Sequence, residues 1–230
     1  MSETTERLPV FPLNAVVFPG VSLPLHVFEG RYRSLVHDLL AVAEVEDRRF
    51  GVVAIREGFE VGQHGMASVH RVGCVVTLDD VRPYPDGRFD IEVTGRRRMR
   101  IQSLQSTRPY LVAEAVVEPA EPVGRAESSG VAEAAERTRS TFEEYRRRLS
   151  TLRGSEVLDA PLPDEPEALS YVLASVCLLT LAERQALLEA EDTLRRLLML
   201  HHALCEEMRA MRAIASLPAT EVARMRWSPN

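Results

Sequence analysis

An apolar stretch interrupted by prolines, near the start of the chain, constrains the fold most. It runs from Leu8 to Tyr32 as LPVFPLNAVVFPGVSLPLHVFEGRY, and its prolines are Pro9, Pro12, Pro19 and Pro24. Proline lacks a backbone N–H and fixes φ, so this run cannot form one long helix or a central strand. We therefore expect two or three short extended pieces, separated at Leu13-Asn14 and at Pro19-Gly20.

The pattern that follows predicts a mostly antiparallel β-domain with one early helix. Apolar residues recur at three- and four-residue steps from Glu29 to Glu44, which predicts an amphipathic helix. Asp86-Gly87 predicts a hairpin turn, because both residue types tolerate positive φ, and Gly95 is expected to end a strand. Alternating or continuous apolar runs predict strands over 49–55, 69–81, 89–94, 97–104 and 110–117. We expect a small curled or barrel-like sheet over residues 7–118.

Composition then changes from strand-forming to linker and helical sequence. Residues 119–130 are rich in Pro, Glu, Ala, Ser and Gly and are interpreted as a linker. Residues 131–217 are predicted to form a helical bundle. Within it, Thr180-Leu-Ala-Glu183 fits a capping box, and a long amphipathic helix is expected from Asp192 to about Ser216. The fold class is therefore α+β.

The residue content excludes several kinds of chemistry. The 230 residues contain no lysine, so all 28 basic residues are arginine. A Schiff-base lysine, a phosphate-loop lysine and a serine–lysine dyad are thereby excluded within this sequence. The formal net charge of −6 argues against a dedicated nucleic-acid binder.

Cysteine use and hydropathy favour a soluble cytoplasmic protein with no membrane association. Cys74, Cys177 and Cys205 have no CxxC spacing and are expected to be free thiols in a reducing compartment. The N-terminus has no signal-peptide core. The longest nearly apolar run, from Tyr171 to Ala182, is shorter than the span of about 20 residues that a membrane helix needs.

No metal site, cofactor or catalytic relay is expected. His64 and His70 are separated by a glycine loop, and His201-His202 are adjacent on a helix and point to different faces. Cys74 and Cys177 lie in apolar patterns, and no GxSxG motif occurs. We therefore expect a protein that is not an enzyme.

The apolar opening stretch offers a candidate surface for polypeptide. Some of its side chains could line a groove where extended polypeptide docks through apolar contact and an exposed strand edge. The alternative is that they all belong to the core. Two further aromatic residues lie in a hairpin and a glycine loop. The candidate substrate-binding residues are Phe11, Leu13, Phe18, Leu25, Phe28, Phe59 and Tyr84.

A basic strand offers an alternative surface for RNA or a nucleotide. On a strand, Arg96, Arg98 and Arg100 share one face and could hold phosphates. The other interpretation is that these arginines pair across strands with carboxylates. The expected partners are Asp90, Glu92 and Glu114.

Several motifs, in order along the chain, resemble the N-terminal, substrate-binding domain of the Lon proteases. They are LPVFPL with LPLHVFEGRY, RFGVVAI with GFEVGQHG, VGCVVTL with VTGRRRMRI, RPYLVAEAVV, and LTLAERQALLEAEDTLRRLLMLHHALCEEM. The resemblance spans about Leu8 to Met211. It implies a PUA-like fold for the β-domain, followed by a helical bundle, and a role in holding unfolded or tagged polypeptide.

The sequence also departs from that family. A Lon protease continues into an ATPase module and a serine–lysine protease domain, whereas this sequence has no GxxxxGK[ST] loop and no lysine. The resemblance therefore implies a stand-alone, non-enzymatic recognition module for unfolded or apolar polypeptide, or an adaptor. A protease or chaperone is the expected kind of partner, and self-association is left open.

Overall fold

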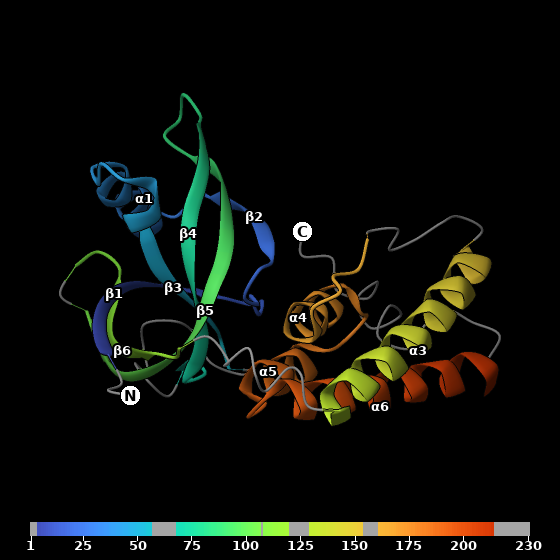
Figure 1. Cartoon of the computed structure of the whole chain (residues 1–230). Coiled ribbons are helices and arrows are strands. Elements are labelled where there is room, and N and C mark those ends of the chain that lie inside the picture. The colour runs from blue at the N-terminus through green and yellow to red at the C-terminus, as the bar shows by residue number, and fades with distance from the viewer. Residues whose placement is uncertain (1–3, 57–67, 107, 120–128, 154–160, 214–230) are drawn as a thin grey trace. The chain divides into compact units, whose positions relative to one another are not determined.

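The computed structural model divides into two compact units, residues 1–120 and 121–230 (Figure 1). It describes residues 4–56, 68–106, 108–119, 129–153 and 161–213. Within these described residues, the first unit holds a six-stranded sheet and one α-helix, and the second holds four helices. The α+β class expected from the sequence is confirmed.

The sheet of the first unit closes on itself through its strand pairings. Its strand order is β2-β5-β4-β3-β1-β6, and β5 also pairs with β6, so five strands form a closed ring of pairings while β2 extends from β5. β1 and β3 are parallel, and the other pairs are antiparallel. The strands are β1 Thr4–Leu13, β2 Ser22–Val27, β3 Arg49–Ala54, β4 Val72–Pro83, β5 Phe89–Gln105 and β6 Leu111–Val117.

The prolines divide the opening stretch as expected, because β1 ends at Leu13 and β2 begins at Ser22. Gly20 lies between them with φ +74°, a conformation that glycine adopts without steric cost. The hairpin turn is also confirmed, since Gly87 has φ +79° and its N–H donates to the Tyr84 carbonyl at 2.9 Å.

The expectation that Gly95 ends a strand is wrong. β5 continues through it to Gln105, with a register shift opposite Val75 and Val76 of β4. A Cβ at position 95 would lie 2.1 Å from the Phe18 carbonyl oxygen. Glycine is therefore needed at this point for close backbone approach, which is one of its ordinary uses inside a strand.

Helix α1, Gly30–Leu40, packs its apolar stripe onto the sheet. Its buried residues are spaced by three and four, so they share one face. Figure 1 shows it beside the sheet, and a short 3₁₀ turn, Val45–Asp47, follows it. The buried residues of the helix are Tyr32, Leu35, Val36 and Leu39.

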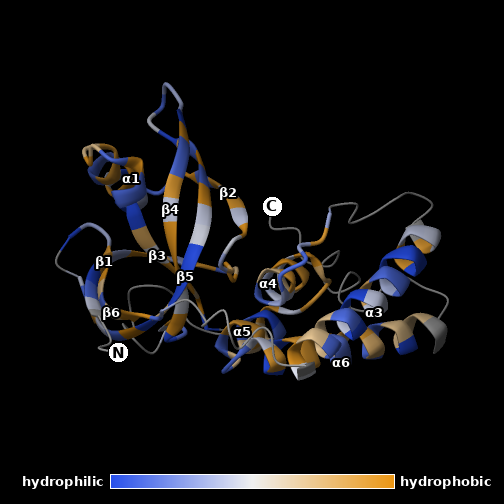
Figure 2. Cartoon of the chain, viewed as in Figure 1, coloured by the Kyte–Doolittle hydropathy of each residue, from blue (hydrophilic) through white to orange (hydrophobic). Residues whose placement is uncertain are grey.

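The second unit is built around the long helix α6, Thr193–Ala213. It contacts α3 Ser129–Arg153, α4 Pro166–Val176 and α5 Leu181–Glu189. Figure 2 shows α4 as mostly hydrophobic, whereas α3 mixes hydrophilic and hydrophobic residues along its length. This difference follows from the sequence, since α3 carries many Arg and Glu residues and α4 carries few charges.

The predicted capping box begins α5. The Glu183 N–H donates to Thr180 Oγ1 at 3.2 Å, and the Thr180 N–H donates to Glu183 Oε2 at 2.7 Å. Both bonds satisfy amides that a helix start would otherwise leave without partners. In the part of the chain that the structure describes, no helix combines the length and the apolar character that crossing a membrane requires.

Candidate functional site

The outer edge of β2 has no partner strand among the residues that the structure describes. Among the described strands, β2 pairs only with β5. The Gly95 N–H donates to the Val21 carbonyl at 2.9 Å, and hydrogen-bonded pairs alternate along antiparallel strands. The backbone groups of Ser22, Pro24 and His26 therefore face away from β5. The missing N–H of Pro24 falls at an outward position, which is where an edge strand tolerates proline.

A strongly exposed aromatic ring follows this edge. Phe28 comes directly after β2, and 62% of its surface is exposed. Its ring stacks beside the His26 imidazole, with 6.3 Å between the centroids and 25° between the planes. Among the large apolar side chains that the structure describes, that of Phe28 is the most exposed, and it adjoins a strand edge that could pair with another chain.

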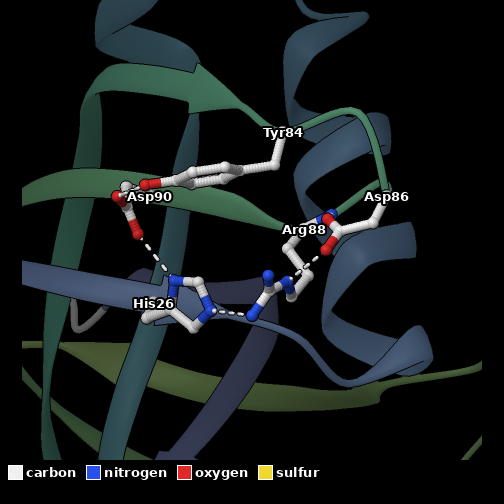
Figure 3. Close-up of polar contacts among 5 residues, drawn as sticks. All are labelled: His26, Tyr84, Asp86, Arg88 and Asp90. Carbon is white, nitrogen blue, oxygen red and sulfur yellow. Dashed lines mark hydrogen bonds and ion pairs between the residues drawn. The ribbon is translucent and has the colours of Figure 1, made fainter.

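A hydrogen-bonded cluster borders the edge (Figure 3). His26 Nδ1 lies 2.6 Å from Asp90 Oδ1, directly across the β2–β5 pair. The Tyr84 hydroxyl donates to the other oxygen of Asp90. Arg88 Nη1 lies 3.4 Å from His26 Nε2, and Arg88 Nε donates to Asp86 at 2.7 Å. The turn between β4 and β5 thus supplies three of the five members, and β5 supplies Asp90.

These contacts indicate which groups of the cluster donate and which accept hydrogen bonds. A guanidinium can only donate, so His26 Nε2 accepts from Arg88 and the Nδ1–H of His26 donates to Asp90 Oδ1. The bond from His26, followed by the bond from Tyr84, lowers the pKa of Asp90. The bond to Asp90 in turn raises the pKa of Tyr84. At neutral pH the cluster therefore holds a carboxylate and a protonated phenol.

The arrangement suits binding rather than covalent chemistry. It offers an aromatic ring, an imidazole and outward-facing backbone groups, and its own donors and acceptors are already engaged with one another. None of its five members is a serine or cysteine nucleophile. Together, Phe28, the open backbone of β2 and this cluster are called the β2 edge site below.

The structure distributes the apolar candidates between the core and the surface. Phe18 is fully buried, and Phe11 is buried and stacks on Tyr32 with 3.9 Å between ring centroids. Leu13 and Leu25 are half-buried and pack against the core. Phe28 is exposed, Tyr84 is half-buried within the cluster, and Phe59 lies outside the described residues.

Phe11 and Phe18 thus act as core residues in this structure, and Phe28 and Tyr84 are the candidates brought to one surface. His26, Asp86 and Arg88 of this site were missed in the sequence as binding residues. The alternation of β2 together with the Asp-Gly turn could have found them, because that register places His26 opposite Asp90.

The three arginines of the proposed phosphate surface, Arg96, Arg98 and Arg100, pair with carboxylates. Arg96 donates to Thr77 Oγ1 at 2.9 Å and to Asp79 at 3.1 Å. Arg98 and Arg100 lie 2.7 and 3.8 Å from the Glu118 carboxylate. Cross-strand pairing is therefore the correct interpretation, although the partners differ from those expected: Asp90 binds His26 and Tyr84, and Glu114 accepts from Ser103.

The remaining candidates concern metals and thiols. Across the described ranges, no group of three or more His, Cys, Asp or Glu side chains is placed to hold a metal ion. Cys74 and Cys177 are buried, and Cys205 is half-buried. His64 lies outside the described residues.

These features define a class: an α+β protein with two compact units, in which β2 pairs with β5 alone among the described strands and a polar cluster borders that edge. The family follows from sequence comparison. The ATP-dependent protease La (LON) substrate-binding domain matches residues 7–206, and the chain belongs to this family. It is thus a substrate-recognition module by family, and the match covers the substrate-binding domain alone.

Individual relatives agree with this assignment. Lon protease 2 of Herpetosiphon aurantiacus is 32% identical over 200 residues, which cover 84% of this chain and 23% of that relative. The chain therefore spans about a quarter of that protein's length. A crystal structure of a Lon N-terminal domain protein from Xanthomonas campestris is 26% identical, with a TM-score of 0.57 over 85% of this chain and 96% of that one.

A second solved structure supports the fold. The N-terminal domain of Mycobacterium avium complex Lon protease is 20% identical and has a TM-score of 0.59 over 87% of this chain and 98% of that one. The expected resemblance to Lon N-terminal domains is thereby confirmed.

Proposed function

We propose that this chain captures extended, apolar polypeptide segments at the β2 edge site. Membership of the substrate-binding family supports a recognition role, and the open edge supplies a place for a client strand to add. Main-chain hydrogen bonds along an edge give affinity without demanding one sequence, and neighbouring side chains add selectivity.

The exposure of Phe28 is the observation that carries this proposal. Covering a phenylalanine side chain that is exposed in the free protein contributes about 1.5 to 3 kcal/mol. The stacked His26 ring and the half-buried Tyr84 extend the apolar and aromatic surface beside it. A client side chain that packs on Phe28 would therefore anchor a strand lying along Ser22 to His26.

The open backbone predicts how the client hydrogen-bonds. Ser22 and His26 can each donate and accept at the edge, whereas Pro24 can only accept. The missing N–H of Pro24 interrupts the row of donors between Ser22 and His26. This interruption disfavours a long ladder of hydrogen bonds between the edges of two copies of the chain. If the helical unit binds a protease or chaperone while the edge holds a client, the chain acts as an adaptor.

The test is fluorescence anisotropy of a labelled, permanently unfolded polypeptide titrated with purified protein at two salt concentrations. We expect saturable binding that changes little with salt, because apolar and backbone contacts are only weakly screened. Phe28→Ala should raise Kd by about tenfold or more, as expected for a loss of about 1.5 kcal/mol or more. Leu198→Ala is the matched control, since Leu198 is 42% exposed but lies on α6.

A second pair of variants tests the edge itself. Ser22→Pro removes an outward N–H together with the hydroxyl that meets Thr94 at 2.9 Å, whereas Ser22→Ala removes only that hydroxyl. Weaker binding by the proline variant alone supports strand addition. An unchanged Kd for both Phe28→Ala and Ser22→Pro overturns the site. Binding that weakens by orders of magnitude with salt would instead indicate phosphate-type contacts.

A further inference from the structure

Two of the three cysteines of this chain are buried, and the third, Cys205, is half-buried. Cys74 and Cys177 are 0% and 1% exposed, and burial raises the pKa of each thiol to about 12. Such thiols hold almost no thiolate at neutral pH and are inert. Cys205, on α6, is half-buried and has a histidine beside it.

The histidine is held in the tautomer that a base requires. His201 Nε2 lies 3.7 Å from Cys205 Sγ, and His201 Nδ1 lies 3.1 Å from Thr141 Oγ1 on α3. The Thr141 hydroxyl donates its own proton to the Arg137 carbonyl at 2.9 Å. Thr141 Oγ1 must therefore accept from His201 Nδ1–H, because its only proton is already used. The lone pair of Nε2 then faces the thiol.

The surroundings also keep this imidazole unprotonated. Partial burial, followed by the positive charge of Arg137 on α3 and the neighbouring His202 on α6, lowers the pKa of His201. A neutral imidazole at pH 7 can accept the thiol proton. Cys205, His201 and Thr141 thus form a thiol–base–orienting chain across two packed helices, with the geometry that activates a cysteine.

We propose that Cys205 is a reversible modification site that undergoes exchange with low-molecular-weight disulfides, with His201 as its base and Thr141 as a positioning residue. His201 Nε2 takes the proton from Cys205, and the thiolate attacks one sulfur of the small disulfide. A new S–S bond forms to Cys205 while the old one breaks, and the departing thiolate takes the proton from His201. The small disulfide supplies the oxidising equivalents, so the exchange balances.

The test treats the full chain with excess cystamine and a chromogenic aromatic disulfide, and locates the adducts by peptide mass mapping. We expect one fast-reacting thiol, Cys205, with Cys74 and Cys177 reacting only in denaturant. Cys205→Ser should remove the fast phase. Fast reaction of Cys74 or Cys177 in the native protein would overturn the proposal.

Variants of the two partners test the roles assigned to them. His201→Ala should slow the reaction of Cys205 at pH 7 by about tenfold or more, and should remove from its pH–rate profile the inflection caused by titration of His201. Thr141→Val should act in the same direction, and Thr141→Ser, which keeps the hydroxyl, should restore the rate. Circular dichroism melts establish that each variant is folded. Equal rates at Cys205 in the parent, His201→Ala and Thr141→Val proteins would overturn the mechanism.

Discussion

The two units bury different kinds of groups. The core of the β unit is almost entirely aliphatic and aromatic, with Phe11, Tyr32 and Phe50 in contact. The helical unit buries apolar residues too, but it also encloses the guanidinium of Arg196, which lies 3.9 Å from the centre of the Tyr171 ring. One unit is therefore held mainly by burial of apolar surface, and the other also depends on directed polar contacts.

The two units also differ in where their polar contacts lie. In the β unit the polar cluster of His26, Tyr84 and Asp90 lies outside the core, where a client can reach it. In the helical unit, one polar contact lies between α6 and α3, where His201 meets Thr141. We therefore expect binding from the first unit and thiol reactivity at Cys205 from the second.

The largest expected effect is a loss of stability when the apolar core of the β unit is disrupted. Phe18→Ala removes a fully buried ring from the β unit and should lower the free energy of unfolding by about 3 to 5 kcal/mol. Chemical denaturation measures this loss, and amide hydrogen exchange with mass spectrometry should assign it to residues of the first unit. A loss below about 1 kcal/mol, or a loss spread equally over both units, would contradict the assignment of Phe18 to the core.

A smaller loss of stability is expected when the buried polar contacts of the helical unit are removed. Arg196 Nε donates to Ser170 Oγ at 2.7 Å and its Nη2 donates to Thr193 Oγ1 at 3.1 Å. Arg196→Met keeps most of the volume but removes these donors, and should cost the helical unit about 1 to 3 kcal/mol. Arg196→Lys should be no better tolerated, because an ammonium cannot reproduce the planar stacking on Tyr171. Full stability of the lysine variant in urea denaturation would argue against this role.

Alkaline pH should lower the stability of both units, because both bury thiols. Burial raises the pKa of Cys74 and of Cys177 to about 12, and in the β unit it also raises the pKa of Tyr32 to about 12. Each group is uncharged when folded, so its contribution is complete below the unfolded pKa, which is 9.0 for a thiol and 10.0 for the phenol, and is lost as pH rises towards 12.

Each thiol should therefore cost about 1.4 kcal/mol of stability for every pH unit between 9 and 12. Above pH 10 the β unit should weaken more steeply than it does between pH 9 and 10, because Tyr32 adds to Cys74. Hydrogen exchange of each unit between pH 8 and 11, corrected for intrinsic rates, measures this. Cys74→Ala should flatten the dependence of the first unit alone, and an unchanged slope in that variant would refute the assignment.

Sequence periodicity predicted the elements well where one physical cause dominates. The prolines predicted the break between β1 and β2, and the capping box predicted the start of α5. The spacing of apolar residues predicted α1 and α6. It failed at Gly95, because a glycine that permits close approach of the Phe18 carbonyl looks the same in sequence as one that ends a strand.

The candidate site was only partly predictable. Phe28 was identified with Phe11 and Phe18, since all three are aromatic residues in one apolar stretch, and nothing local indicates which one the sheet leaves outside. Which strand has a free edge depends on pairings made far along the chain. Arg196 was missed in the same way, because a buried arginine is recognised only by the Ser170 and Tyr171 that surround it.

The pairing of β2 with β5 has a consequence for when the chain becomes able to bind. Ser22 and Thr94, which meet side by side in this pairing, are 72 positions apart in sequence. Contacts between such distant residues close long loops, and they form late in folding because the entropy of closure is lost before the contacts stabilise the sheet. The early, proline-interrupted stretch therefore leaves the ribosome long before its edge exists. During synthesis the same apolar residues behave first as a segment in need of protection, and only later as the surface that we propose captures such segments.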